Sequence, residues 1–200
     1  MPPNPNKADW AKKTPTAGEE AERKVIEDLY KFGQRNKMPM FITYNHKFFH
    51  LIESREVGGG IENILTGEHD IMLIHRDHGA IFIQVKNIDA MRTLQKNINI
   101  AKGQLKNDVL SLEVARQNMM KDVEEDSAED IGVSVCVIAL PNVKKTQIEK
   151  RPLKDMPVPT VYLCEDDLES MDSLKQWWEE NIQKRNSVFD SNTYLKLLAM

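Results

Sequence analysis

The sequence predicts an α/β sandwich in which helices flank a mixed central β-sheet. Residues 69–75 and 80–86 are apolar runs separated by a short polar linker that ends in Gly79, which is typical of a β-hairpin. Residues 133–140 and 160–164 are apolar almost throughout, as in strands that are buried on both faces. Helical patterns precede and separate these runs, so the expected order is helix, strands, hairpin, helix, strand, strand, helix.

The first third of the chain predicts one helix followed by short strands. Thr16 and Glu19 have the spacing of a capping box, so a helix is expected to begin near Thr16. Its apolar residues then recur at helical spacing: Val25, Ile26, Leu29 and Phe32. Met40–Tyr44 and Phe48–Ile52 are apolar runs that fit two strands, or one strand and its approach. Gly58–Gly60 predicts a flexible loop.

The rest of the chain predicts two helices around the later strands. A long helix is expected over about residues 101–123. Its apolar stripe consists of Ala101, Leu105, Val109, Leu112 and Met119. Residues 141–158 contain several prolines and predict a loop, and residues 165–184 predict a final amphipathic helix. Trp177 and Trp178 belong to the apolar stripe of that helix and are expected in the core.

Length and composition indicate a single intracellular domain, cytoplasmic or nuclear. The 200 residues suit one domain at 16–184, with a flexible lead-in at 1–15 and a tail, or short helix, at 185–200. No apolar run has the length of a membrane span, and the first residues lack the hydrophobic core of a secretory signal. Cys136 and Cys164 are expected as buried free thiols, and the absence of a Cys/His cluster argues against structural zinc.

Charge is segregated along the chain. The net charge of −4 argues weakly against a nucleic-acid binder. However, residues 86–106 and 143–154 each carry five basic residues and one acid, whereas acids gather at 122–130 and 164–172. Such a chain can present a basic groove despite a negative total; the alternative is two solvated faces and an acidic loop. The histidines lack metal-ligand spacing and are expected mostly at surface or turn positions: His46, His50, His69, His75 and His78.

Three polar residues occupy strands that are otherwise built for burial. Because strand side chains alternate, Gln84 and Lys86 share one face of their strand. Asp70 begins the partner strand, and closing the hairpin is expected to place it opposite Val85 or Lys86, within one residue. Asp70, Gln84 and Lys86 are therefore expected to converge at one end of the sheet.

Glu22 extends the apolar stripe of the first helix toward its N-terminus, because it precedes Val25 by three residues and Ile26 by four. A carboxylate on a buried stripe needs a partner, which makes Glu22 a candidate site residue. The alternative is an acid of the first turns that complements the helix dipole.

Two carboxylates, an amide oxygen and an ammonium suit magnesium-dependent phosphodiester hydrolysis. Magnesium takes oxygen ligands and activates water, and a lysine positions that water and stabilises the developing charge.

The pattern Asp70-x(13)-Gln84-Val85-Lys86, with apolar strands around both halves, resembles that of the PD-(D/E)xK nuclease superfamily. The segments AERKV (21–25), HDIMLI (69–74) and IFIQVKN (81–87) look most like the nuclease-related NERD domains. The Mrr-like restriction enzymes are similar and accept glutamine in the first position of the final pair. The resemblance covers about residues 16–140. It implies a restriction-endonuclease-like three-layer sandwich.

The resemblance also implies site residues. Asp70 matches the essential aspartate, Gln84 the position of the usual glutamate, and Lys86 the lysine. Glu22 matches the acid of the first helix, and Gln104 a helix glutamine that often follows the motif. The implied metal ligands are Asp70, Gln84 and Glu22, holding Mg²⁺, for which Mn²⁺ can substitute. If Gln84 is a ligand, Gln84→Glu is expected to preserve or raise activity.

The expected function is a metal-dependent nuclease acting on DNA, with RNA less favoured. The expected nucleic-acid-binding residues are Gln104, Lys102, Lys106, Lys144 and Lys145. Since Gln84 replaces an acid, the alternative is a degenerate nuclease-fold module that binds nucleic acid or a protein partner without cutting. Related domains often accompany NTPase modules, so association with such a module, or a homodimer, is a further expectation.

Overall fold

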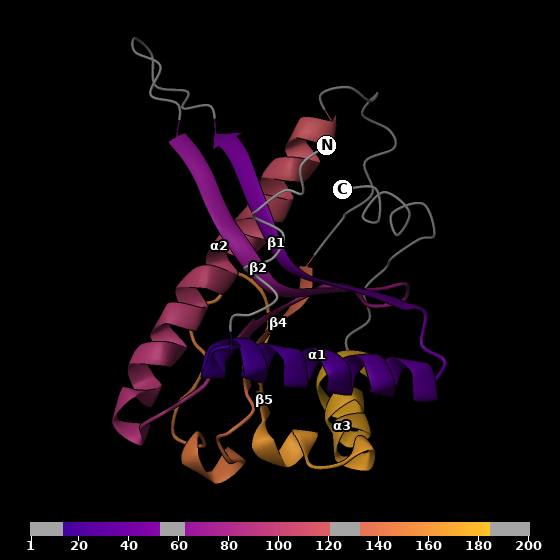
Figure 1. The fold of residues 1–200 in the computed structure, drawn as a ribbon. Helices are drawn as coiled ribbons and strands as arrows, with labels where there is room; N and C mark the ends of the chain where they lie inside the picture. Colours follow the sequence, from indigo (N-terminus) through magenta and orange to yellow (C-terminus); the bar gives the residue numbers. More distant parts are fainter. Residues whose placement is uncertain (1–13, 53–62, 121–132, 185–200) are drawn as a thin grey trace, which may run out of the picture.

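The computed structural model describes residues 14–52, 63–120 and 133–184, and its centre is a five-stranded sheet with the strand order β1-β2-β3-β4-β5 (Figure 1). The strands span β1 Met40–Ile52, β2 Asn63–His75, β3 Gly79–Val85, β4 Val133–Leu140 and β5 Thr160–Cys164. β1, β2 and β3 pair antiparallel, whereas β3, β4 and β5 pair parallel. The sheet is therefore mixed, as the sequence predicts.

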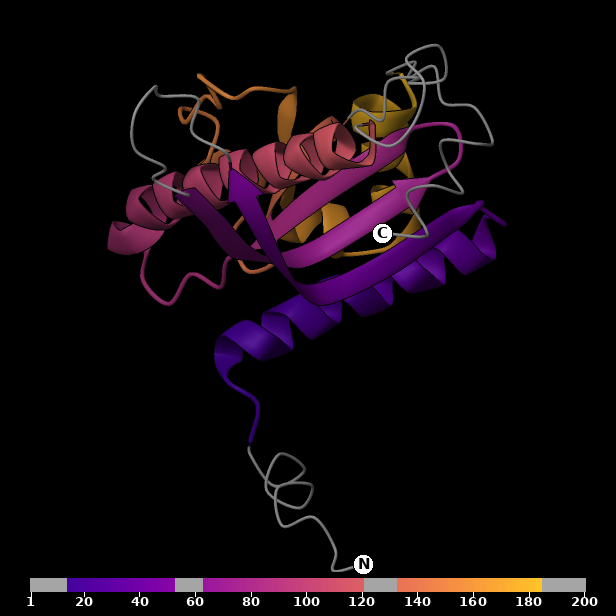
Figure 2. The same cartoon turned by 90° about the horizontal axis from the view of Figure 1, so that it is seen from above.

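Helices cover both faces of the sheet, which gives three layers. α1 (Ala17–Arg35) and α2 (Leu94–Met120) lie on opposite sides of the sheet (Figure 2). α3 (Met171–Trp178) shares the layer of α1, and the ring centroids of Phe32 and Trp178 lie 5.7 Å apart. Side chains alternate along β4, so that Val137 packs with α1 and α3 while Cys136 and Ile138 pack with α2. The α/β sandwich predicted from the sequence is confirmed.

The start of α1 fixes the position of Glu22, a candidate site residue. The Thr16 hydroxyl accepts a hydrogen bond from Glu19 N at 3.2 Å, and Thr16 N donates to the Glu19 carboxylate at 2.6 Å, which confirms the capping box. Leu29 and Phe32 are fully buried against the sheet. Burial of each contributes about 2–3 kcal/mol and holds α1 against the sheet.

β1 and β2 continue beyond the rest of the sheet as a two-stranded ribbon beside α2 (Figure 1). β2 pairs with β1 at every position except Asp70, and with β3 only from Ile71 onward. Asp70 therefore lies at the point where β2 separates from β3. Extending the Ile71–Ile83 pairing by one position places Asp70 opposite Gln84, one residue from the expected Val85.

Several boundaries differ from the sequence expectations. The two apolar runs at 40–44 and 48–52 belong to one strand, β1. Asn45 lies between them within this strand and has a positive φ of 52°. α2 begins at Leu94 rather than near 101, because Leu94 and Ile98 already pack against the sheet. The final helical segment is interrupted: η6 Glu165–Leu168, α3 and a π-turn, η7 Glu179–Gln183, replace one continuous helix at 165–184.

Two histidines are buried, contrary to the surface or turn positions expected for most of them: His69 is 4% exposed and His75 is 3% exposed. Trp177 and Trp178 lie in the core as predicted, and both cysteines are buried free thiols. Within the described ranges, no helix combines the length and the hydropathy that crossing a membrane requires. The expected loop at Gly58–Gly60, the acidic stretch at 122–130, the tail at 185–200 and nearly all of the lead-in lie outside the described residues.

Candidate functional site

The hairpin brings Asp70, Gln84 and Lys86 together, as the sequence predicts. Asp70 Oδ2 accepts a hydrogen bond from the backbone N–H of Val85 at 2.9 Å. The ammonium of Lys86 lies 3.5 Å from that same oxygen and donates to Gln84 Oε1 at 3.3 Å. The side chains of Lys86 and Asp70 are 16% and 13% exposed. Lys86 is thus held between a carboxylate and an amide oxygen in a largely desolvated place.

A buried polar network continues from Gln84 to α2. Gln84 is fully buried, and its Nε2 donates to Asp108 Oδ2 at 3.1 Å. Asp108 Oδ1 lies 3.0 Å from His69 Nδ1, and both side chains are at most 5% exposed. His69 stacks on Phe82 at a centroid distance of 4.7 Å, and Ser111 Oγ lies 3.5 Å from His69 Nε2. The network therefore joins β2, β3 and α2 on the side of the sheet that α2 covers.

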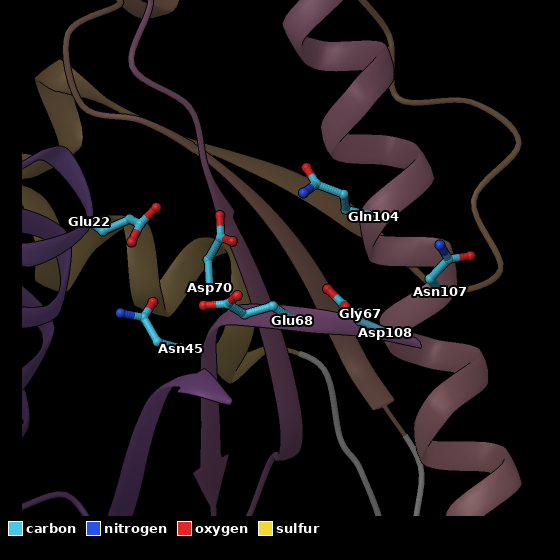
Figure 3. A pocket seen from close by; sticks show the side chains of 8 residues that line it. All are labelled: Glu22, Asn45, Gly67, Glu68, Asp70, Gln104, Asn107 and Asp108. Carbon is cyan, nitrogen blue, oxygen red and sulfur yellow. The ribbon is translucent and has the colours of Figure 1, made fainter. Parts of the chain in front are cut away.

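A cavity of about 420 Å³ opens beside Asp70, between α1, α2 and the ribbon. Its lining residues are Glu22, Asn45, Gly67, Glu68, Asp70, Gln104, Asn107 and Asp108. Figure 3 shows Glu22 reaching in from α1 and Gln104 from α2, with the carboxylate of Asp70 between them. The acid on the first helix, the strand aspartate and the helix glutamine that the sequence singled out therefore face one cavity.

Two of these carboxylates have raised pKa values. Burial is the main cause for Glu22, and the negative charges of Asp70 and Glu68 raise the pKa further, while Lys86 lowers it. Burial also raises the pKa of Asp70, partly offset by Lys86 and by the hydrogen bond from the Val85 amide. Burial and neighbouring negative charge both disfavour the ionised form of these two carboxyl groups, so a cation in the cavity would stabilise both ionised groups.

Gln104 presents an unused acceptor to this cavity. Within the described chain its Oε1 is buried and has no hydrogen-bond partner. A buried acceptor without a partner costs about 1–3 kcal/mol, so a group in the cavity that donates to this oxygen, or binds it as a cation does, would be stabilised. Gln104 is thus better placed to contact a ligand than to support the fold.

The other expected nucleic-acid contacts lie outside the cavity lining. Lys102 and Lys106 are on α2, half-buried and exposed respectively, and Lys144 is exposed in the loop that follows β4. Lys145 has a structural partner, because its ammonium lies 2.6 Å from the buried carboxylate of Asp167. That contact raises the pKa of Lys145 and fastens the loop to η6.

The two basic segments of the sequence meet in space. Asn142 exchanges two hydrogen bonds with the backbone of Ile88, at 2.9 and 3.1 Å. Arg151 Nη1 donates to Gln95 Oε1 at 2.6 Å. Residues 143–154 therefore pack against the segment that follows Lys86, at the carboxyl ends of β3 and β4.

Sequence reasoning missed Asp108, and it did not single out His69 or Glu68 as site residues. Asp108 follows Gln104 by four residues and so lies on the same face of α2, which was the available signal. His69 directly precedes Asp70, at the place where the family name has a proline. Its burial depends on the packing of Phe82, which no local pattern reports.

A search of solved structures finds a similarity to the small subunit (R.BspD6I2) of the heterodimeric restriction endonuclease R.BspD6I. The TM-score is 0.42 at 14% sequence identity, over 96% of this chain and 83% of that one. No protein-family model and no curated protein sequence matches the chain. The roles assigned to individual side chains rest on the contacts described above.

Proposed function

We propose that this chain is a metal-dependent nuclease that hydrolyses phosphodiester bonds of DNA, with RNA less favoured. The observation that carries the proposal is the position of Lys86, whose ammonium lies between Asp70 and Gln84 beside a cavity that Glu22 also lines. A desolvated cation next to clustered carboxylates suits the stabilisation of a charged transition state. The motif resemblance and this geometry support the same chemistry.

The residues present fit magnesium, for which manganese can substitute. The donors around the cavity are oxygens: the carboxylates of Glu22 and Asp70 and the unpartnered amide oxygen of Gln104. We assign metal binding to Glu22 and Asp70. Gln84 is the third ligand expected from the motif, but its oxygen accepts from Lys86, so we assign it to holding that lysine. When bound, the ion would lower the pKa of a water molecule and neutralise charge on the phosphate.

Each side chain then has a role of its own. Lys86 orients the attacking water and stabilises the charge that develops on the phosphate oxygens. Asp70 holds the Lys86 ammonium and, through the Val85 amide, keeps its own carboxylate in a fixed orientation. The basic segments that meet near the end of β3 would contact the phosphate backbone on either side of the cleaved bond.

A second candidate is a nuclease-fold module that binds nucleic acid without cutting it. One observation favours it: in the described ranges, no three residues among His, Cys, Asp and Glu are grouped so that they could hold a metal ion. In addition, Gln84 stands where the motif has an acid, and a neutral side chain there lowers the negative charge available to a divalent cation. The two candidates predict the same surface but a different response to metal.

The test is a cleavage assay on linear, circular and single-stranded DNA and on RNA, with Mg²⁺, Mn²⁺ or EDTA. Lys86→Met is compared with Lys175→Met, which removes a lysine on α3 that pairs with Glu179. Metal-dependent cleavage that Lys86→Met abolishes and Lys175→Met retains would support the nuclease. Salt-sensitive DNA binding without cleavage under any condition would refute it and support the binding module.

A further inference from the structure

The side chain of Gln84 has two hydrogen-bonding ends, and the structure uses both. Its Oε1 accepts from Lys86 at 3.3 Å, and its Nε2 donates to Asp108 at 3.1 Å. A glutamate at this position would have no N–H for Asp108. The glutamine therefore matches its surroundings, and the acid that the motif has at position 84 would not.

We propose that Asp108 is a positioning residue for phosphodiester hydrolysis, and that the Gln84–Asp108 pair together replaces the acid of the motif. Asp108 accepts from the amide of Gln84 and thereby directs Gln84 Oε1 toward Lys86. Asp108 also lines the cavity, so it supplies from α2 the negative charge that the neutral side chain of Gln84 on β3 does not carry. This inference rests on the proposed nuclease function.

Asp108 is itself held in one orientation, which a positioning residue requires. It is 2% exposed, and its second carboxylate oxygen lies 3.0 Å from His69 Nδ1. The Ser111 hydroxyl donates to the backbone carbonyl of Asp108 at 2.8 Å. With one oxygen committed to His69 and the other to Gln84, the carboxylate cannot rotate without breaking a buried contact.

The arrangement predicts the effect of each single substitution. Gln84→Glu places two carboxylates in contact, which is unfavourable in a buried place. With the proton of His69 on Nδ1, facing Asp108, Asp108→Asn retains an oxygen for His69 and turns an N–H₂ toward Gln84. Gln84 must then present its oxygen to position 108 and its own N–H₂ to Lys86, so that the ammonium loses an acceptor.

The double substitution Gln84→Glu with Asp108→Asn restores every contact and reverses the polarity of one of them, the hydrogen bond between positions 84 and 108. One oxygen of the new glutamate accepts from the asparagine, and the other faces Lys86. The prediction is therefore reciprocal rescue: each single variant loses about 100-fold in kcat through misplacement of Lys86, and the double variant recovers most of it. This differs from the expectation that Gln84→Glu alone preserves or raises activity.

The experiment measures kcat and KM for DNA cleavage, and urea unfolding, for the wild type, both single variants and the double variant. Kinetics are recorded at a temperature at which unfolding shows all four to be folded, so that a loss of kcat reports on site geometry. The matched control is Gln176→Glu on α3, because Gln176 also donates its amide to a carboxylate, that of Glu180, at 2.9 Å, but on an exposed surface far from the site in sequence. The control should leave kcat unchanged.

Rescue of kcat in the double variant supports the inference. Wild-type kcat in Gln84→Glu alone, or a folded double variant no better than the single variants, overturns it. If the wild type cleaves nothing, the proposed function fails, and the pair is then judged by unfolding: additive losses without coupling between positions 84 and 108 overturn the contact itself.

Discussion

Protonation of His75 is expected to destabilise the hairpin that carries the candidate site. His75 ends β2 and is buried, and its Nδ1 accepts a hydrogen bond from the Asp77 amide at 3.1 Å. Its ring packs against His78 and Trp178, with centroid distances of 4.6 and 5.7 Å. Burial is the main reason that the pKa of His75 falls from 6.5 to about 4, and the neighbouring His78 lowers it further. The folded state therefore holds His75 as a neutral acceptor.

The sign and size of the effect follow from linkage. The unfolded chain takes up a proton at His75 near pH 6.5, whereas the folded chain does so only near pH 4. The contribution of neutral His75 is fully present above pH 6.5 and is lost as the pH falls toward 4. The free energy of unfolding should decrease by about 2 kcal/mol between pH 7.5 and pH 5 from this residue alone.

Urea unfolding at these two pH values, for the wild type and His75→Asn, measures the effect. The asparagine oxygen can still accept from the Asp77 amide, so the variant loses packing but also loses the titration. The difference between the two pH values should then be smaller by about 2 kcal/mol in His75→Asn. His78→Asn, which retains His75, should keep most of the loss. An equal loss in the wild type and in His75→Asn would refute the reasoning.

Three further predictions concern the cavity and the loop after β4. Gln104→Leu should leave the unfolding free energy unchanged or higher, since it removes a buried acceptor without a partner, yet reduce cleavage about tenfold; a loss of stability with normal cleavage would contradict this. Lys145→Met should lower the free energy of unfolding by about 1–3 kcal/mol, because it removes the ion-pair partner of the buried Asp167, and should leave DNA affinity unchanged. Lys144→Met should leave the free energy of unfolding unchanged and weaken DNA binding, as measured by filter binding. Calorimetric Mn²⁺ affinity should fall on acidification, and the fall should begin at a higher pH than it would for an unperturbed aspartate, because the pKa of Asp70 is raised. Asp70→Asn should abolish the binding, and an affinity that does not change on acidification would count against Asp70 as a ligand.

Most of the fold could be predicted from the sequence because its strands and caps are local signals. β4 and β5 have the predicted bounds, and the capping box at Thr16 forms as expected. The early start of α2 was missed because residues 94–100 contain two asparagines and two isoleucines, which are mediocre helix formers. There, packing of Leu94 and Ile98 on the sheet outweighs local propensity.

The candidate site was predictable where it depends on strand alternation. Asp70, Gln84 and Lys86 meet as expected because a hairpin register leaves only one residue of freedom. Its continuation through Asp108 and His69 depends on the depth and rotation of α2 against the sheet. Those are set by the whole apolar interface between α2 and the sheet, so no spacing within the sequence reveals them.

The replacement of an acid at position 84 has a different meaning in space than in the motif. Compared position by position, Gln84 removes one negative charge from the site. In the fold, Gln84 Nε2 lies 3.1 Å from Asp108, which lines the cavity beside Asp70 and lies 24 residues further along the chain. The negative charge that position 84 lacks is therefore carried by Asp108, the hydrogen-bond partner of Gln84. Whether such a motif is degenerate therefore depends on the residue that contacts the substituted side chain. Here that residue is Asp108, which lies outside the motif.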